Sequence, residues 1–410
     1  MSWELNRVGD ICKVKSGKRL PKGMSVQDEP TTRKYLRVTD LKSHVVDESD
    51  IKYISEDIFK LISRYTISCD DIYISIAGTI GKVGIIPASI DGISLTENCC
   101  KLTELNKSKI IQHFLLHYLR SYEGQSKMQA KTGGASQPKL AITRLKDILI
   151  PTPPIQTQNH IADILSAYDD LIENNLKRIK LLEQAAQNIY KEWFVHLRFP
   201  GYENAPINEE TGLPVGWEVC TINDVCEKVA SGGTPSRRNK SYWDNPKYPW
   251  VTTKELRDGF ILDVKESVSE EGLKNSSAKL FPKGTILMAI YASPTLGRLG
   301  ILSREACCNQ AAVGFICDNT KISNQFLYYT LYSERANLNA IAIGAAQQNI
   351  NVGKVKAHEI ILPPFHFVER FTSITSSNYE MRLNLVTQNQ KLKAARDILL
   401  PRLMNRTIEV

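Results

Sequence analysis

Cationic and polar side chains concentrate in two short segments that lie far apart along the chain. The first, residues 13–22, is rich in lysine, and the second, residues 231–240, combines two glycines with arginine and lysine. Cationic side chains and exposed backbone amides contact phosphate, whereas Ser, Thr, Asn, Gln and Arg side chains can read base edges. A charged segment more often belongs to a solvated surface, but the occurrence of two such segments at equivalent places favours contact with DNA.

The candidate DNA-contacting residues form one set in each half of the chain, in expected loops or at strand ends. The set in the first half comprises Lys15, Lys18, Arg19, Lys22, Arg37, Thr39, Ser75, Thr79, Lys82, Gln137 and Lys139. The set in the second half comprises Thr234, Ser236, Arg237, Arg238, Lys240, Thr252, Lys254, Tyr291, Ser293, Arg298, Gln347, Gln348 and Asn349. We expect Arg37, Arg237 and Arg238 to contact phosphate or guanine. Gln137 and Gln347 are expected to read bases, because amides pair with adenine in the major groove.

Patterns that would indicate catalysis are incomplete. Gly78 and the Gly81-Lys82 pair are too close in sequence for a phosphate-binding P-loop, which has four residues between its glycines. His113 and His117 lie four residues apart without the glutamate of a zinc protease, so structural histidines are the safer interpretation. We therefore predict no catalytic residues and no metal ligands.

Length and composition indicate a folded, multidomain chain. At 410 residues it is long enough for two or three domains, and its net charge of +8 weakly suggests a polyanionic partner. The nine cysteines include no Cys-x-x-Cys pair, which favours reduced structural thiols over disulfides or metal. No run approaches the ~20 apolar residues of a membrane-spanning helix, and the first residues do not resemble a secretory signal. We expect a cytoplasmic protein without a membrane contact.

The elements that must position the candidate residues occur twice in the sequence. Segments with similar patterns recur at an offset of about 214 residues, and internal repeats of this kind report a duplicated unit. They include an expected strand that runs into a turn of small residues and an expected apolar helix. The matched pairs are residues 3–5 with 217–219, 9–12 with 223–226, 35–39 with 248–252, 71–77 with 284–290, and 110–119 with 324–332.

Each copy ends at a Pro-Pro pair that is followed by a long heptad-like pattern of apolar residues. The pairs at 153 and 363 lack the Asn or Asp that precedes them in amino-methyltransferases, so we interpret them as helix entries. The first pattern places Ile161, Leu165, Tyr168, Ile172, Asn175, Ile179, Leu182, Ala186, Ile189 and Trp193 on one helix face. The second places Phe371, Ile374, Asn378, Met381, Leu385, Gln388, Leu392, Ala395 and Leu399 on one face.

Two matched long helices in one chain predict that each covers the apolar face of the other. An antiparallel coiled coil would relate the two copies by a pseudo-twofold axis, and duplex DNA has strands of the same antiparallel symmetry. Asn175, Asn378 and Gln388 on these faces could fix the register of the pair. Partial exposure of these three side chains is the alternative, and both interpretations stay open.

This organisation resembles the specificity (S) subunit of type I restriction-modification enzymes, over nearly the whole chain. The local matches that carry the resemblance are residues 190–201, 212–217, 231–236 and 399–403, together with the glycine-led segments that begin at Gly134 and Gly344. The resemblance implies two α/β (α+β) target-recognition domains, each followed by a long helix. The implied boundaries are 1–152 for the first domain, 153–200 for the first helix, 201–216 for a linker, 217–362 for the second domain and 363–410 for the second helix.

The resemblance also implies a function and partners. One domain would read each half of a split double-stranded DNA target, and the helices would bind two modification (methyltransferase) subunits. Restriction and translocase subunits complete the larger assembly. S-adenosylmethionine, ATP and Mg²⁺ would be held by those partners and none by this chain, which is expected to be non-catalytic.

Two features depart from the family pattern, and two other functions stay open. The helix entries lack the usual Glu-Gln pair, most clearly at residues 364–368, and Pro401 is expected to bend or end the second helix. The first alternative function is a self-contained DNA-modifying or DNA-cleaving enzyme. The second is a protein-interaction scaffold with no role in DNA binding.

Overall fold

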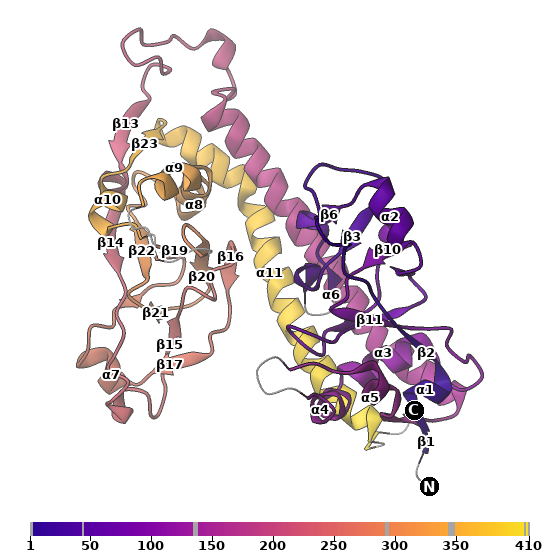
Figure 1. The fold of residues 1–410 in the computed structure, drawn as a ribbon. Helices are drawn as coiled ribbons and strands as arrows, with labels where there is room; N and C mark the ends of the chain where they lie inside the picture. Colours follow the sequence, from indigo (N-terminus) through magenta and orange to yellow (C-terminus); the bar gives the residue numbers. More distant parts are fainter. Residues whose placement is uncertain are drawn as a thin grey trace. The chain divides into compact units, whose positions relative to one another are not determined.

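The computed structural model describes residues 3–42, 45–133, 138–291, 295–342, 349–405 and 407–408. The chain divides into two compact units (Figure 1). Unit 1 comprises Met1–Glu173 and Lys391–Val410, and unit 2 comprises Asn174–Gln390. Each unit therefore contains one copy of the sequence repeat and a segment of each long helix.

Unit 1 is built on two four-stranded sheets, with strand orders β6-β3-β10-β7 and β2-β11-β8-β9, and on the pairs β1-β12 and β4-β5. Strand β8 lies between two neighbours and all four of its residues are buried, which agrees with the apolar run Ile72–Ile74 that precedes Ser75. The strands are β1 (Glu4–Arg7), β2 (Lys13–Ser16), β3 (Lys34–Leu36), β4 (Leu41–Lys42), β5 (Val45–Val46), β6 (Lys52–Tyr53), β7 (Thr66–Ile67), β8 (Ile72–Ser75), β9 (Val83–Gly84), β10 (Ile93–Leu95), β11 (Cys99–Thr103) and β12 (Leu149–Thr152).

Unit 2 repeats this architecture. Its sheets have the orders β17-β15-β21-β18 and β14-β22-β19-β20-β16, and β13 pairs with β23 as β1 pairs with β12. It differs by the added strand β16, which runs parallel to β20. The strands are β13 (Glu218–Thr221), β14 (Cys226–Ser231), β15 (Tyr248–Val251), β16 (Gly259–Ile261), β17 (Glu266–Val268), β18 (Leu280–Phe281), β19 (Ile286–Ala289), β20 (Leu299–Leu302), β21 (Ala306–Cys308), β22 (Ala312–Cys317) and β23 (Glu359–Leu362).

The short helices also correspond between the two units. Helices α2 and α7 begin with the same cap, in which a serine side chain, Ser55 or Ser269, accepts a hydrogen bond from a backbone N–H of the first turn. The predicted matches 71–77 with 284–290 and 110–119 with 324–332 are confirmed as β8 with β19 and α3 with α8. The helices are α1 (Val8–Ile11), α2 (Glu56–Ile62), α3 (Gln112–Arg120), α4 (Tyr122–Ala130), α5 (Ile142–Lys146), α7 (Glu270–Lys274), α8 (Asn324–Ser333), α9 (Arg335–Ala340) and α10 (Val352–Lys356).

The two long helices are α6 (Ile155–Tyr190), which continues into a π-helical turn at Lys191–Val195, and α11 (Phe365–Met404). Every residue predicted to lie on the apolar face of α6 is buried or half-buried. In unit 2 the Asn175 amide donates a 2.9 Å hydrogen bond to Asn389, so Asn175 is a buried and paired polar residue. The antiparallel coiled coil and its pseudo-twofold axis stay predictions.

The predicted contact face of α11 is wrong at three positions. Ile374 and Met381 are 45% and 43% exposed, and Gln388 is also exposed. The residues buried in their place each follow by one position, and they are polar: Thr375, Arg382 and Asn389.

Specific partners explain this burial, because a buried polar group is stable only when it is hydrogen-bonded or ion-paired. Thr375 Oγ1 donates to Gln325 Oε1 over 2.9 Å. Arg382 pairs with Glu183 of α6 and donates to the Tyr329 hydroxyl over 3.1 Å. The spacing of apolar residues cannot predict a helix face that is buried through polar side chains.

Pro401 lies inside α11, which continues through it to Met404. Of the two predicted outcomes, that Pro401 bends or ends the helix, the second is wrong by less than one turn. A proline removes one backbone donor, and in the last turn this loss costs little because few hydrogen bonds follow it.

Three further observations concern the described residues. All nine cysteines are free thiols in this structure. No group of three or more His, Cys, Asp or Glu side chains in the described part of the chain is arranged to hold a metal ion. No described helix is both long enough and apolar enough to cross a membrane.

Candidate nucleic-acid interface

Two loops meet in unit 1 at what we call the loop junction, formed by residues 16–19 after β2 and residues 95–99 between β10 and β11. The Gly17 N–H donates to the carbonyl oxygen of Cys99, and the Lys18 N–H donates to that of Leu95, each over 2.9 Å. A Cβ atom on Gly17 would lie 2.0 Å from the Thr96 carbonyl oxygen. Only glycine therefore permits this close approach.

Unit 2 forms the same junction from residues 231–234 and 308–312. The Gly232 N–H donates to the carbonyl oxygen of Ala312 over 3.0 Å, and the Gly233 N–H to that of Cys308 over 2.9 Å. A Cβ atom on Gly232 would lie 2.1 Å from the Cys308 carbonyl oxygen. The backbone geometry is thus shared, and Glu97 of unit 1 corresponds to Gln310 of unit 2.

A third segment returns beside each junction. Lys139 forms a β-bridge with Ala77 in unit 1, and Asn349 forms one with Tyr291 in unit 2. The next residue, Leu140 or Ile350, donates its backbone N–H to the carbonyl oxygen of the residue that directly follows β8 or β19, over 2.9 Å in each unit. The segments predicted to contact DNA at 139 and 349 are therefore placed next to the glycine-containing loops, although they are distant in sequence.

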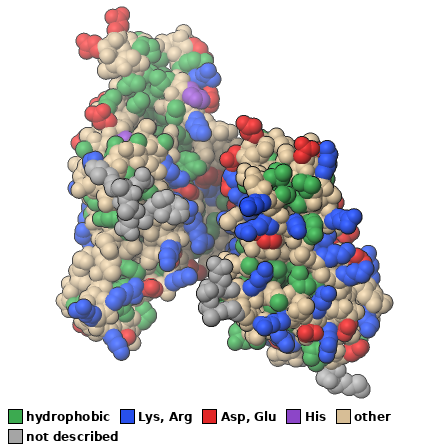
Figure 2. Space-filling model, in the orientation of Figure 1, with side chains coloured by type: hydrophobic (Ala, Val, Ile, Leu, Met, Phe, Trp, Pro, Cys, Tyr) green, Lys and Arg blue, Asp and Glu red, His purple; other side chains and the backbone are tan. Residues whose placement is uncertain are grey.

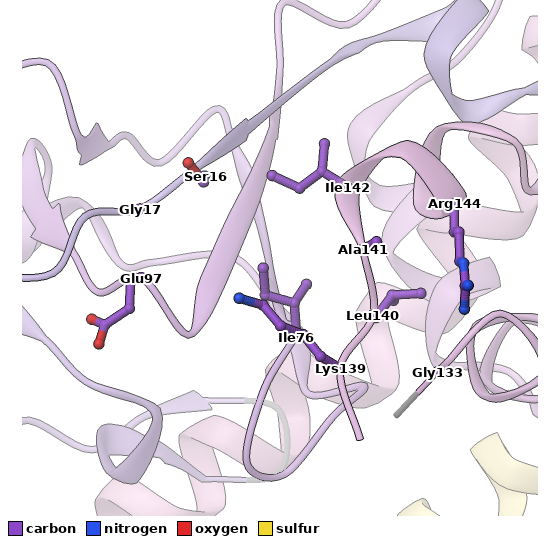
Figure 3. A pocket seen from close by; sticks show the side chains of 10 residues that line it. All are labelled: Ser16, Gly17, Ile76, Glu97, Gly133, Lys139, Leu140, Ala141, Ile142 and Arg144. Carbon is purple, nitrogen blue, oxygen red and sulfur yellow. The ribbon is translucent and has the colours of Figure 1, made fainter. Parts of the chain in front are cut away.

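In unit 1 the three segments line an open cavity of about 630 Å³. Figure 3 shows Glu97 beside Ser16 and Gly17 on one side of this cavity and Arg144 on the other. Its remaining lining residues are Ile76, Gly133, Lys139, Leu140, Ala141 and Ile142. A cavity with an acceptor on one wall and cationic groups on another can recognise a ligand that carries both donors and negative charge.

The side chains at the two loop junctions differ in charge. In unit 1, Arg19 Nε lies 3.3 Å from Glu97 Oε1, and the Thr96 hydroxyl donates to Glu97 Oε2 over 2.9 Å. In unit 2, the Thr234 hydroxyl donates to the side-chain oxygen of Gln310. The first junction therefore presents an ion pair, and the second presents a neutral pair.

Three residues of unit 1 that were predicted to contact DNA form hydrogen bonds within the domain instead. The Arg37 guanidinium donates to Asp40 over 2.7 Å and to Asp50 over 3.1 Å, and these hydrogen bonds, that to Asp40 foremost, raise its pKa. The Lys82 ammonium donates to the carbonyl oxygen of Leu41 over 2.6 Å, and burial lowers its pKa. Ser75 is fully buried, and its hydroxyl donates to the Thr79 carbonyl oxygen over 2.5 Å.

The other predicted residues of unit 1 lie nearer the surface. Lys15 donates to Glu104 over 2.7 Å, the Lys18 ammonium lies 5.5 Å from the centre of the Tyr65 ring, and Thr39 contacts Asp40 over 3.4 Å. All seven of these residues are exposed: Lys15, Lys18, Arg19, Lys22, Thr39, Thr79 and Lys139.

In unit 2, Arg237 is held against an aromatic side chain. Its guanidinium carbon lies 3.7 Å from the centre of the Trp243 ring, and it also pairs with Glu266. The Thr252 hydroxyl donates to Glu255 over 2.5 Å. The exposed members of the set are Ser236, Arg237, Arg238, Lys240, Lys254 and Tyr291, and the half-buried members are Thr234, Thr252, Arg298 and Asn349.

Four predicted residues, Gln137, Ser293, Gln347 and Gln348, lie outside the described residues. The sequence prediction missed Glu97, Gln310 and Arg144. Their signal was weak, because only the polar character of residues 96–98 and 308–310 marked these loops. Figure 2 shows Lys and Arg side chains scattered over the visible face of each unit.

Comparisons with known proteins identify the family of the chain. The family model described as the type I restriction modification DNA specificity domain matches residues 1–184 and 214–367. The type I restriction enzyme MjaIX specificity subunit of Methanocaldococcus jannaschii is 28% identical over 304 residues, which cover 73% of this chain and 69% of that protein. The HindI specificity subunit of Haemophilus influenzae is 25% identical over 365 residues, which cover 74% of this chain and 78% of that protein.

The fold is also found in a solved structure. The S subunit of a type I restriction-modification system from M. genitalium aligns with a TM-score of 0.58 at 15% sequence identity, over 98% of this chain and 96% of that chain. This likeness concerns the fold, including the two α/β copies and the long helices.

Proposed function

This chain belongs to the family of type I restriction-modification DNA specificity domains, and on that premise we propose that its two copies each select one half of a split double-stranded DNA target. The observation that carries the proposal is the duplicated loop junction. The same backbone arrangement occurs in both units, while the side chains at 97 and 310 differ. Equivalent surfaces with different side chains suit the reading of two different half-sites.

Partner subunits supply the chemistry in this proposal. Two modification subunits bind the chain and bring S-adenosylmethionine, while restriction and translocase subunits bring ATP and Mg²⁺. The long helices offer a surface for such partners, since Leu176, Leu181, Ile374 and Met381 of unit 2 are exposed apolar side chains on α6 and α11. The chain itself is a non-catalytic subunit of a cytoplasmic complex.

Exchange of one domain tests the proposal directly. Residues 1–152 are replaced by the corresponding domain of a related specificity subunit, and the chain is produced in cells with its modification partner. Sequencing of methylated bases in the cellular DNA should show a change in one half of the target only. Exchange of residues 217–362 is the matched experiment and should change the other half. A change in both halves after either exchange contradicts the proposal.

Two measurements on purified protein separate the proposal from the alternatives. Affinity for duplex DNA should fall steeply and linearly with salt on a log-log scale, because bound phosphates release counterions. A flat response would favour a protein scaffold. The isolated chain with DNA, Mg²⁺ and S-adenosylmethionine should neither methylate nor cleave, and turnover would favour a self-contained enzyme.

A further inference from the structure

The two loop junctions share a backbone but not their side chains, and one pair of positions concentrates the difference. Arg19 and Glu97 in unit 1 correspond to Thr234 and Gln310 in unit 2, as the equivalent hydrogen bonds of Gly17 and Gly232 show. The backbone on both sides of each pair is fixed by these hydrogen bonds. The side chains therefore project from a rigid support rather than from a free loop.

Glu97 is negatively charged, whereas the other charged residues of the cavity are cationic. It is an acceptor on the wall of a cavity that Lys139 and Arg144 also line. Its side chain is 34% exposed, so it is accessible, and Arg19 and Thr96 hold both of its oxygen atoms in place. A carboxylate is repelled by DNA phosphates, so at such a surface its favourable contact is with a base amino group, above all N4 of cytosine.

Gln310 occupies the same position with a neutral amide. Its side-chain oxygen accepts a hydrogen bond from Thr234, and the residue is exposed. An amide both donates and accepts, so it can make two hydrogen bonds to the N6 and N7 atoms of adenine. Glu97 cannot do so while ionised, because it only accepts.

We propose that Glu97 and Gln310 are specificity-determining residues at one equivalent position of the two copies. Glu97 accepts a hydrogen bond from a cytosine amino group in the first half-site. Gln310 pairs with adenine in the second half-site. The proposal rests on the function proposed above and adds to it the residues that make the two half-sites differ.

The test uses the full chain assembled with its modification subunits. Wild type, Glu97→Gln and Gln310→Glu are compared for binding to, and methylation of, duplex libraries in which each base pair of both half-sites is varied. Glu97→Gln should change the preference at one base pair of the first half-site about tenfold or more. The second half-site should keep its preference, which also proves that the variant is folded. Gln310→Glu should give the mirror result.

Glu123→Gln is the matched control, because Glu123 is an exposed carboxylate of the same copy that pairs with Lys127, outside the candidate DNA-contacting set. It should leave every base preference unchanged. The inference is overturned if Glu97→Gln alters binding equally on all sequences or leaves all preferences intact while wild type is selective. If wild type itself shows no selectivity, the proposed function fails instead.

Discussion

The two units differ in the balance of ionic and aromatic contacts that hold the two long helices. In unit 1 the contacts are ionic and titratable. Asp169 of α6 accepts hydrogen bonds from Arg120 of α3 over 2.9 Å and from Arg396 of α11 over 2.6 Å. Beside them, His117 of α3 lies 3.2 Å from the Ser166 hydroxyl of α6.

In unit 2 one buried ion pair, Arg382 of α11 with Glu183 of α6, is accompanied by a large aromatic cluster. Tyr190 and Phe194 at the end of α6 pack against Phe326 of α8 and Phe371 of α11, with ring centres 4.7 to 5.9 Å apart. The position of His117, six residues after the cap of α3, is taken in α8 by Tyr329, whose hydroxyl accepts a hydrogen bond from Arg382 over 3.1 Å. The next residue, Thr330, accepts a hydrogen bond from the Tyr190 hydroxyl over 3.0 Å.

The difference shows that the duplicated fold requires a covered helix face but not a particular chemistry. An aromatic cluster depends on shape and buried area. A buried ionic network depends on the presence of every partner and on pH. The two units should therefore respond to different perturbations, although their strands and helices correspond.

Phe371→Ala should have the largest effect, because it removes a fully buried ring from the centre of the aromatic cluster. The free energy of unfolding of unit 2 should fall by about 3–5 kcal/mol. Urea unfolding followed by tryptophan fluorescence reports on this unit, which holds Trp193, Trp217, Trp243 and Trp250 of the five tryptophans. Hydrogen exchange should accelerate in α8 and stay unchanged in α3. Equal acceleration in both helices would show that the two clusters are not separate.

Asp169→Asn should have the next largest effect, and it should appear in unit 1. The variant removes the carboxylate shared by Arg120 and Arg396, whose side chains are only 9% and 11% exposed. Unit 1 should lose roughly 2–4 kcal/mol, since two largely buried guanidinium groups would lose the carboxylate that they share. Hydrogen exchange of α3 measures this loss. The exposed neighbour provides the control, and Asp170→Asn should have little effect; a similar loss there would argue against the ionic network.

The pH dependence of stability should also separate the units. Burial lowers the pKa of His117 from 6.5 to about 3, so below pH 6.5 the unfolded chain binds a proton that the folded chain does not. Unit 1 should therefore lose stability as the pH falls, by about 2 kcal/mol between pH 6.5 and 5. Urea unfolding at several pH values, read by hydrogen exchange in α3, measures the slope. His117→Gln should flatten it, and an unchanged slope would assign the effect to other groups.

Tyr190→Phe should have the smallest effect. It keeps the ring and removes only the hydroxyl that donates to Thr330, which still donates to the carbonyl oxygen of Phe326 over 3.0 Å. Unit 2 should lose about 1 kcal/mol, measured by tryptophan fluorescence in urea. A loss as large as that of Phe371→Ala would mean that the hydrogen bond, and not ring packing, dominates this contact.

Much of the fold could be predicted from the sequence, because local patterns carry it. The repeat, the buried strand β8 and its counterpart β19, and the long helix α6 follow from periodicities within single segments. The contact face of α11 could not be predicted in the same way. Thr375, Arg382 and Asn389 are buried only because Gln325, Glu183 and Asn175 meet them, and those partners are distant in sequence.

The residues of the candidate site also fall into those that could be predicted from the sequence and those that could not. The segments that carry Lys15, Arg19 and Arg238 could be identified from composition, because a cluster of cationic residues is visible in the sequence alone. Arg37 and Lys82 turn inward to carboxylates and carbonyl oxygens, which composition does not reveal.

The amino-acid sequence by itself determined that the chain is a duplicated α/β unit with a long helix after each copy, because strand and helix periodicities are local properties. The tertiary structure alone decided which loops meet, and so placed Glu97 and Gln310 at equivalent junctions beside Lys139 and Asn349. Close backbone approach at Gly17 and Gly232 and the pairing of buried polar groups are interactions between distant segments. These interactions stabilise the chain only after folding has brought the distant segments together.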